Sequence, residues 1–116
     1  MTSGFNKEMR ISSSREIAAI IDNGKSLSCY PIKLFYIERQ VASFSRMAVA
    51  VPKKSFKRAV DRNLLKRRVR ESYRILRPEL DTKEEYYDLF MIYIGKEIQS
   101  YDRIRKAVGT LLEKVG

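Results

Sequence analysis

A long amphipathic helix, predicted between about Arg58 and Leu76, constrains the fold of this chain most. At about 100° per residue, its side chains separate into two opposite faces. The apolar face carries Leu64, Leu65, Val69, Ser72 and Leu76. The polar face carries Arg62, Asn63, Lys66, Arg67, Arg70, Arg74 and Arg77. Such a helix must bury its apolar face against another element, and a sheet is the expected partner.

The positive charge of the chain is concentrated around this helix. Between Lys53 and Arg77 there are eleven Lys or Arg residues but only two acids, Asp61 and Glu71, which gives +9 of the +10 carried by the whole chain. A merely solvated helix face usually mixes both signs. A field concentrated in this way attracts polyanions, and release of their counterions drives binding. The block therefore indicates a nucleic-acid partner, with an anionic membrane surface as the less favoured alternative.

The predicted helices have recognisable ends. Ser13 and Glu16 match a capping box that begins a short helix, and Gly24 ends it. The long helix is expected to stop before Pro78, because the residue that precedes a proline avoids the helical region. Asp102 is expected to cap a last helix.

Apolar patterns predict the strands between these helices. They cover residues 26–38, 47–51 and 87–94. The order helix, strands, helix, strand, helix indicates an α/β or an α+β sandwich. By its length the chain forms a single domain, residues 1–116, in which the polar residues 1–11 are expected to be a flexible arm.

Several classes of site are excluded by composition. The chain has no histidine and one cysteine, Cys29, so it has neither a Cys/His zinc site nor an internal disulfide. This cysteine usage indicates a reducing compartment, and we expect a cytoplasmic protein. Apolar runs such as Leu89–Ile94 are far shorter than the roughly 20 residues needed to span a bilayer. With neither a histidine base nor a Gly-rich phosphate loop, catalysis by protein side chains is not expected.

The segment AVDRNLLKRRVRE, from Ala59 to Glu71, closely resembles the signature of the bacterial ribonuclease P protein subunit. That family carries Arg-Asn-Arg-x-Lys-Arg-x-x-Arg-Glu on a helix entered from a strand that ends in a Lys-Lys pair, here supplied by Val49–Lys54. The similarity covers nearly the whole chain. It implies an α+β, two-layer αβββαβα sandwich with a central four-stranded mixed sheet. It also implies a left-handed β-α-β crossover, against the usual rule.

The resemblance also implies a function. The family's protein binds the catalytic RNA of ribonuclease P, an endoribonuclease that removes the 5′ leader of precursor tRNA. The RNA and its Mg²⁺ ions perform the hydrolysis. The protein is then expected to have no catalytic residue, no metal site and no cofactor of its own. Its partners would be the ribonuclease P RNA and precursor tRNA, and the protein alone would be a monomer.

The resemblance assigns two groups of binding residues. Contacts to the catalytic RNA are implied for Lys53, Arg62, Asn63, Lys66, Arg67 and Arg70. A cleft between the first helix and the sheet, which holds the leader, is implied to be lined by Ile17, Ile21, Phe35 and Lys54. The third residue of the motif, often arginine in the family, is Leu64 here. The residues alone leave a second interpretation open, in which the two isoleucines and Phe35 belong to the core.

Two other functions are compatible with the composition. The first is a structural RNA-binding protein of the ribosomal type with no role in catalysis. The second is a membrane-surface protein that uses the basic helix. Interfacial helices usually present bulky aromatic residues on their apolar face. Because the apolar face here consists of Leu and Val with Ser72, it suits packing on a sheet better.

Overall fold

The computed structural model describes residues 9–116. Its elements in chain order are α1 (Ser14–Asn23), β1 (Lys25–Cys29), β2 (Ile32–Arg39), β3 (Arg46–Ala50), α2 (Ala59–Asp81), β4 (Tyr86–Tyr93) and α3 (Tyr101–Lys114). The strands form one four-stranded sheet in the order β1-β2-β4-β3. β3 and β4 are parallel, and the other neighbours are antiparallel. The predicted α+β class with a mixed four-stranded sheet is confirmed.

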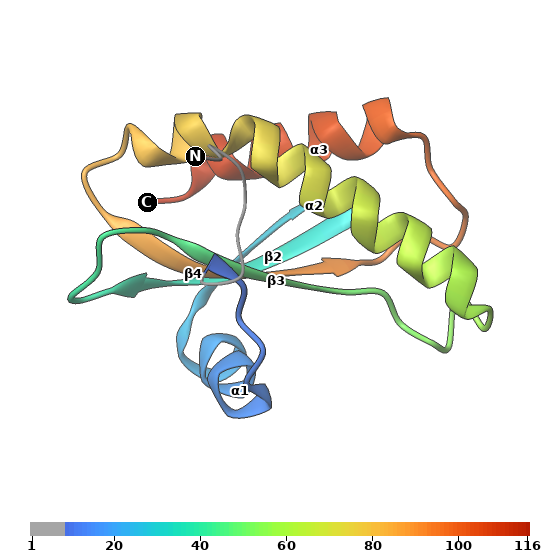
Figure 1. Cartoon of the computed structure of the whole chain (residues 1–116), viewed down its shortest axis with the longest axis horizontal. Coiled ribbons are helices and arrows are strands. Elements are labelled where there is room, and N and C mark those ends of the chain that lie inside the picture. The colour runs from blue at the N-terminus through green and yellow to red at the C-terminus, as the bar shows by residue number, and fades with distance from the viewer. Residues whose placement is uncertain (1–8) are drawn as a thin grey trace.

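The helices cover the two faces of the sheet unequally. Figure 1 shows α2 and α3 side by side on one face and α1 alone on the other. The sheet with α2 and α3 makes the two layers that were predicted, and α1 adds a partial layer beneath them. Each face buries its own apolar cluster. The larger cluster lies under α2 and α3, and the smaller one lies under α1.

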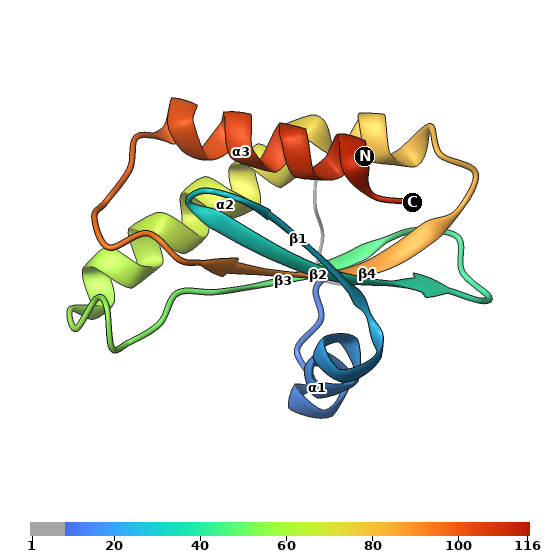
Figure 2. The same ribbon diagram turned by 180° about the vertical axis from the view of Figure 1, so that it is seen from behind.

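The connection between β3 and β4 is a left-handed crossover. In Figure 1, β3 lies nearest the viewer and runs to the right, α2 returns to the left above the sheet, and β4 runs to the right behind β3. Figure 2 shows the same arrangement from behind, with β1 in front. Nearly all such connections in other proteins are right-handed. The handedness expected from the family resemblance is confirmed.

The apolar face of α2 differs in detail from the predicted face. The buried residues of the helix are Leu65, Val69, Ser72, Tyr73 and Leu80. Leu64 and Leu76 are only partly buried. Tyr73 was not predicted to face the sheet, yet its side chain is fully buried. The helix therefore packs with one large aromatic ring at its centre.

The predicted strand 26–38 is wrong in one respect, since it is a hairpin of two strands. β1 and β2 pair antiparallel, with Leu27 opposite Leu34 and Cys29 opposite Ile32. Tyr30 and Pro31 form the turn between them. Proline cannot donate a ladder hydrogen bond, so it lies in the turn and not inside a strand. The apolar alternation has the same period on both sides of the turn, which hid the reversal.

The predicted end of the long helix before Pro78 is also wrong. α2 continues to Asp81 with Pro78 inside it. Leu80 is fully buried in the larger cluster, and Arg77 Nε lies 3.4 Å from Asp81 Oδ2. Burial of this leucine and the ion pair across the last turn offset the hydrogen bond that Pro78 cannot donate. The connection from α2 to β4 is therefore short and covers residues 82–85.

The caps of the other helices agree only in part with the prediction. Ser13 caps α1 as predicted and accepts a hydrogen bond of 3.3 Å from the backbone N–H of Glu16. The cap of α3 is Ser100, not Asp102, because the Ser100 hydroxyl accepts from the N–H of Arg103 at 3.2 Å. Asp102 lies in the first turn, where its charge favours the helix dipole.

The last two residues of the predicted N-terminal arm pack against the sheet. Arg10 forms an isolated parallel bridge with Met47, and the backbone N–H of Ile11 donates to the Met47 carbonyl at 3.0 Å. Ile11 is buried in the smaller cluster. This contact extends the β3 edge of the sheet and places Arg10 near α2. Residues 1–8 of the predicted arm lie outside the described residues.

Gly24, which joins α1 to β1, is required by a close backbone approach. A Cβ at this position would lie 2.5 Å from the carbonyl oxygen of Tyr36, and it would also meet the carbonyl oxygen of Ile20. Since neither backbone atom can move freely, we expect Gly24→Ala to destabilise the protein by about 1–3 kcal/mol. Thermal unfolding should show a lower midpoint, by about 4 °C per kcal/mol.

Gly109 in α3 provides the matched control for this substitution. A Cβ there would meet only Leu76 Cδ1, at an ordinary contact distance of 3.5 Å. Gly109→Ala should therefore raise the midpoint, because glycine inside a helix costs about 0.5–1 kcal/mol relative to alanine. Equal midpoints for the two variants would show that the Gly24 junction is not tightly packed.

Candidate nucleic-acid interface

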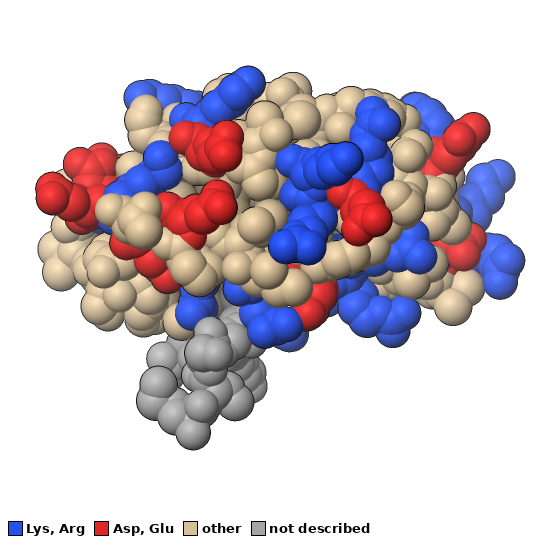
Figure 3. Space-filling model, turned by 90° about the horizontal axis from the view of Figure 1, so that it is seen from above, with Lys and Arg blue, Asp and Glu red and all other residues tan. Residues whose placement is uncertain are grey.

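The basic face of α2 lies at the protein surface. Asn63 and Arg67 are exposed, and Arg62, Lys66 and Arg70 are half-buried. Figure 3, which looks down on α2 and α3, shows Lys and Arg side chains gathered over the middle and right of this side. Acidic side chains gather at the left end, where α2 ends and the chain leads into β4. The basic patch therefore lies on the exposed surface of α2.

Part of this face forms an arginine-lined pocket of about 380 Å³. Its lining consists of Arg10, Asn63, Arg67, Arg70, Glu71 and Arg74. Three of the predicted RNA-binding residues, Asn63, Arg67 and Arg70, therefore come together, and Arg10 from outside the helix joins them. We call this set the arginine pocket. Sequence reasoning missed Arg10, because this residue fell in the predicted arm and only its bridge to β3 places it beside α2.

The charges of the arginine pocket favour an anion. Its single acid, Glu71, is held by Arg74 through two hydrogen bonds of 2.6 and 3.0 Å, which lower the pKa of the Glu71 carboxyl. Burial, and then the nearby charge of Arg10, lower the pKa of Arg70. Within residues 9–116, no ion pair joins Arg67 or Arg70 to a carboxylate. Because guanidinium groups remain charged and grip phosphate with paired donors, the pocket suits a phosphate group.

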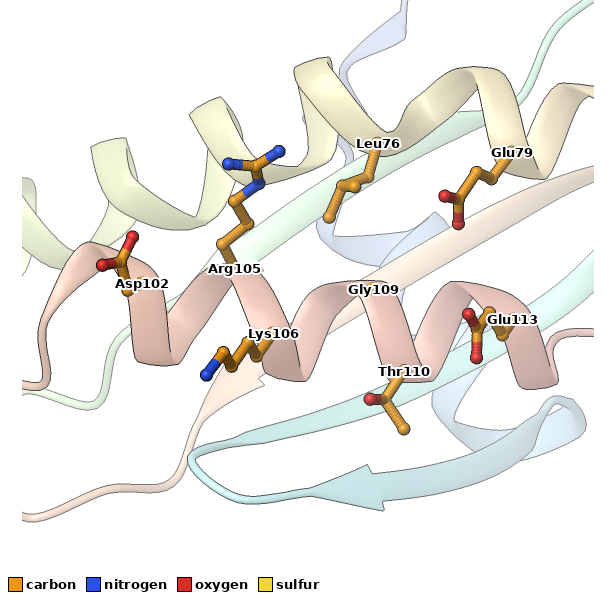
Figure 4. A pocket seen from close by; sticks show the side chains of 8 residues that line it. All are labelled: Leu76, Glu79, Asp102, Arg105, Lys106, Gly109, Thr110 and Glu113. Atoms are coloured by element: carbon orange, nitrogen blue, oxygen red, sulfur yellow. The ribbon is translucent and has the colours of Figure 1, made fainter.

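A larger cavity, of about 540 Å³, lies between α2 and α3, and its charges are mixed. Figure 4 shows Leu76 pointing from α2 toward Gly109, with charged side chains along both sides. Those charges are Glu79, Asp102, Arg105, Lys106 and Glu113. Three acids against two bases would repel a phosphate backbone. The arginine pocket, not the larger cavity, is therefore the candidate nucleic-acid site.

Other residues of the predicted RNA-binding group lie outside the arginine pocket. Arg62 Nη1 donates to the carbonyl oxygens of Phe56 and Lys57 at 2.8 and 2.9 Å. This side chain therefore fastens the loop before α2 to the helix. Lys53 is exposed on the turn that follows β3, and Lys66 is half-buried on α2. These three residues extend the basic surface toward the start of the helix.

Three further arginines of α2 have partners within the protein. Arg74 is bound to Glu71, and Arg77 pairs with Asp81 and donates to the sulfur of Met9. Arg68 donates to the Gln99 carbonyl oxygen at 2.6 Å and so ties α2 to the segment before α3. The charged surface that α2 directs to solvent is therefore smaller than the seven-residue polar face that the sequence predicts.

The predicted leader-binding residues fall into different environments. Ile17 and Phe35 are partly buried and pack against the same small cluster beneath α1. Ile20, not either predicted isoleucine, fills the buried position of α1 and is 1% exposed. Ile21 is 42% exposed. Lys54 is exposed on the turn after β3.

An arginine that the sequence did not single out fixes α1 to the sheet. Arg46 Nε and Nη2 each donate to an Asp88 oxygen at 2.9 Å, and Nη2 also donates to Glu16 Oε2 at 2.7 Å. The hydrogen bonds to Asp88 and, less strongly, to Glu16 raise the pKa of Arg46 against the opposing effect of burial. A lone arginine at the start of a strand gives no sequence signal for this role. The contact ties the first turn of α1 to β3 and β4.

Neither a membrane span nor a metal cluster occurs in the described part of the chain. No helix within residues 9–116 is both long and apolar enough to cross a membrane. The same residues contain no group of three or more His, Cys, Asp or Glu that could hold a metal ion.

Known proteins resemble this chain in both sequence and fold. A family model described as Ribonuclease P matches residues 5–116. The ribonuclease P protein component of Porphyromonas gingivalis is 31% identical over 98% of this chain and 88% of its own length. That of Clostridium botulinum is 34% identical over 95% of this chain and 96% of its own length. The solved ribonuclease P protein from Thermotoga maritima is 25% identical with a TM-score of 0.76, over 92% of this chain and 97% of the other. The chain therefore belongs to the ribonuclease P protein family.

Proposed function

We propose that this protein binds the ribonuclease P RNA through the arginine pocket and the adjoining basic face of α2. The observation that carries the proposal is the convergence of Arg10, Arg67 and Arg70 on one concave surface whose single acid is already paired. Family membership makes the chain a component of a tRNA-processing ribonuclease and supports the ribonuclease P RNA as its partner. A folded RNA presents closely spaced phosphates, and each one neutralised releases counterions.

The protein contributes binding and not the chemical step. Mg²⁺ ions held by the RNA supply the hydrolytic chemistry of leader removal. The arginine pocket reduces phosphate repulsion where the RNA folds against α2, and the exposed part of the sheet beside α1 holds the single-stranded leader. Ile17, Phe35 and Lys54 are the residues proposed for that second surface, with Ile21 at its outer edge. The protein acts in the cytoplasm and is a monomer until it meets the RNA.

Reconstitution tests this function directly. Adding the purified protein to ribonuclease P RNA should lower the Mg²⁺ concentration required for cleavage of precursor tRNA, because protein cations replace part of the ionic screening. Cleavage is measured by gel electrophoresis over a Mg²⁺ titration, with the RNA alone as the reference. A protein that binds ribosomal RNA equally well and leaves the Mg²⁺ requirement unchanged would instead be a structural RNA-binding protein.

A further inference from the structure

The part of the sheet beside α1 carries a row of residues that no motif assigns. The strand register places Ser28, Lys33, Ile92 and Ala50 side by side across the four strands. The next row contains Ser26, Phe35, Phe90 and Ala48. Paired residues in adjacent strands point to the same face. Because Phe35 packs on the cluster beneath α1, both rows face the α1 side.

These two rows are only partly covered by α1. Phe90 and Ala48 are buried beneath the helix. Lys33, Phe35, Ile92 and Ala50 are half-buried, and Ser26 and Ser28 are exposed. The sheet face is therefore open from the middle strands out to the edge strand β1. Four strands at about 4.8 Å spacing make this surface roughly 14 Å wide.

Lys33 is the unusual residue of this surface. It lies on β2, between two paired strands, where lysine has low β-propensity and no exposed edge to protect. Its Nζ lies 5.2 Å from the centroid of the Phe35 ring. Its cross-strand neighbours, Ser28 and Ile92, are uncharged. Within residues 9–116, no ion pair joins Lys33 to a carboxylate.

We propose that Lys33 and Phe35 form one nucleotide-binding unit for the leader of precursor tRNA. The ring of Phe35 offers a stacking surface for a base, and the ammonium of Lys33 takes the adjoining phosphate. Single-stranded RNA combines these two needs, since its unpaired bases stack on aromatic rings while a basic edge follows the backbone. This inference rests on the proposed function and adds a residue to its second surface.

The unit also defines the course of the leader. Lys54 follows the end of β3, and Lys33 lies near the start of β2, which runs in the opposite direction, so both are toward the same end of the sheet. A leader that passes Lys54 therefore crosses the strands past Ile92 and reaches Lys33. Beyond Lys33 it meets the exposed hydroxyls of Ser26 and Ser28 on β1. Hydroxyl groups there can exchange hydrogen bonds with the ribose 2′-OH groups of RNA.

Leader length provides the test. The reconstituted holoenzyme is titrated with precursor tRNAs whose leaders contain two or eight nucleotides, and with mature tRNA, under conditions that block cleavage. We expect Lys33→Ala to weaken binding of the eight-nucleotide precursor about five- to tenfold and to leave mature tRNA unaffected. The slope of log affinity against log salt should fall by about 0.7 for the long leader, as for one contact to a single strand. Lys33→Arg should retain the affinity.

Lys25→Ala is the matched control. Lys25 lies on β1 opposite Tyr36, which faces α2 and α3, so it carries the same charge on the opposite face of the same sheet. This variant should bind both precursors normally. Equal losses for Lys25→Ala and Lys33→Ala would overturn the proposal, because general charge would then explain the effect. Normal affinity of each variant for ribonuclease P RNA shows that it is folded.

Phe35→Ala separates this inference from the function on which it rests. If Phe35→Ala weakens long-leader binding and Lys33→Ala does not, the two-residue unit is refuted and the leader surface stands. If neither variant changes leader binding, the proposed leader surface itself is refuted. If both variants lose affinity for the long leader only, the unit is supported.

Discussion

Replacing Arg67 and Arg70 together by alanine is expected to weaken binding to ribonuclease P RNA by roughly 100-fold. Both side chains line the arginine pocket, and neither pairs with a carboxylate within residues 9–116. A hydrogen bond to a charged group contributes about 1.5–3 kcal/mol, and about 1.4 kcal/mol corresponds to a tenfold change in affinity. The salt dependence should change as well, because removing each phosphate-binding cation lowers the slope of log affinity against log salt by about 0.7–0.9. Filter binding across a salt series measures both quantities.

The control for this pair is Arg105→Ala with Lys106→Ala on α3. Both are exposed, and they lie beside the mixed-charge cavity of Figure 4. The double variant removes the same net charge from a neighbouring helix. It should retain near-normal affinity and salt slope. If both double variants lose affinity equally, the RNA responds to net charge, and α2 has no special role.

The second large effect is expected from Arg46→Met, which removes the link between α1 and the sheet. Arg46 joins Asp88 and Glu16, and only 20% of its side chain and 14% of the Asp88 side chain are exposed. Removing Arg46 leaves the partly buried Asp88 carboxylate with only its longer contact to Arg39 Nε, at 3.6 Å, and loss of the closer partner costs about 3 kcal/mol for such pairs. We expect the midpoint of thermal unfolding to fall by about 10 °C. Calorimetry measures this change.

An exposed ion pair supplies the comparison for Arg46. Arg58 Nε lies 4.0 Å from Asp61 Oδ2, and the Arg58 side chain is 76% exposed. Arg58→Met should change the stability by less than about 1 kcal/mol, because solvent screens such pairs. Similar midpoints for Arg46→Met and Arg58→Met would mean that the Arg46 contacts do not hold α1 in place.

The long helix and its basic face were predictable because many residues share one period. An error at any single position leaves the pattern of apolar and basic residues intact. The ends of elements depend on fewer residues. Pro78 indicates a stop in the local sequence, and the burial of Leu80 against distant parts of the chain, together with the Arg77–Asp81 ion pair, overrides it. The local apolar pattern missed the β1–β2 hairpin because Pro31 interrupts two strands of identical alternation, and the third strand before α2 followed only from the family resemblance.

The candidate site was predictable only where it follows one helix. Asn63, Arg67 and Arg70 lie within two turns of α2, so their spacing alone brings them together. Arg10 joins them through a bridge to Met47, and Arg46 reaches Glu16 and Asp88 across three elements. Such contacts depend on the register of the sheet, which local patterns do not specify. Local patterns do not specify the left-handed crossover either, and this prediction followed only from the family resemblance.

Site-directed crosslinking tests most directly whether the α2 face lies on the RNA. In a Cys29→Ser background, Asn63→Cys and, separately, Lys106→Cys are labelled with a photoreactive reagent and assembled with ribonuclease P RNA. Both positions are exposed, and they lie on different helices of the same layer. The account predicts efficient crosslinks to the RNA from position 63 and few from position 106. Crosslinks from position 106 with none from position 63 would contradict it.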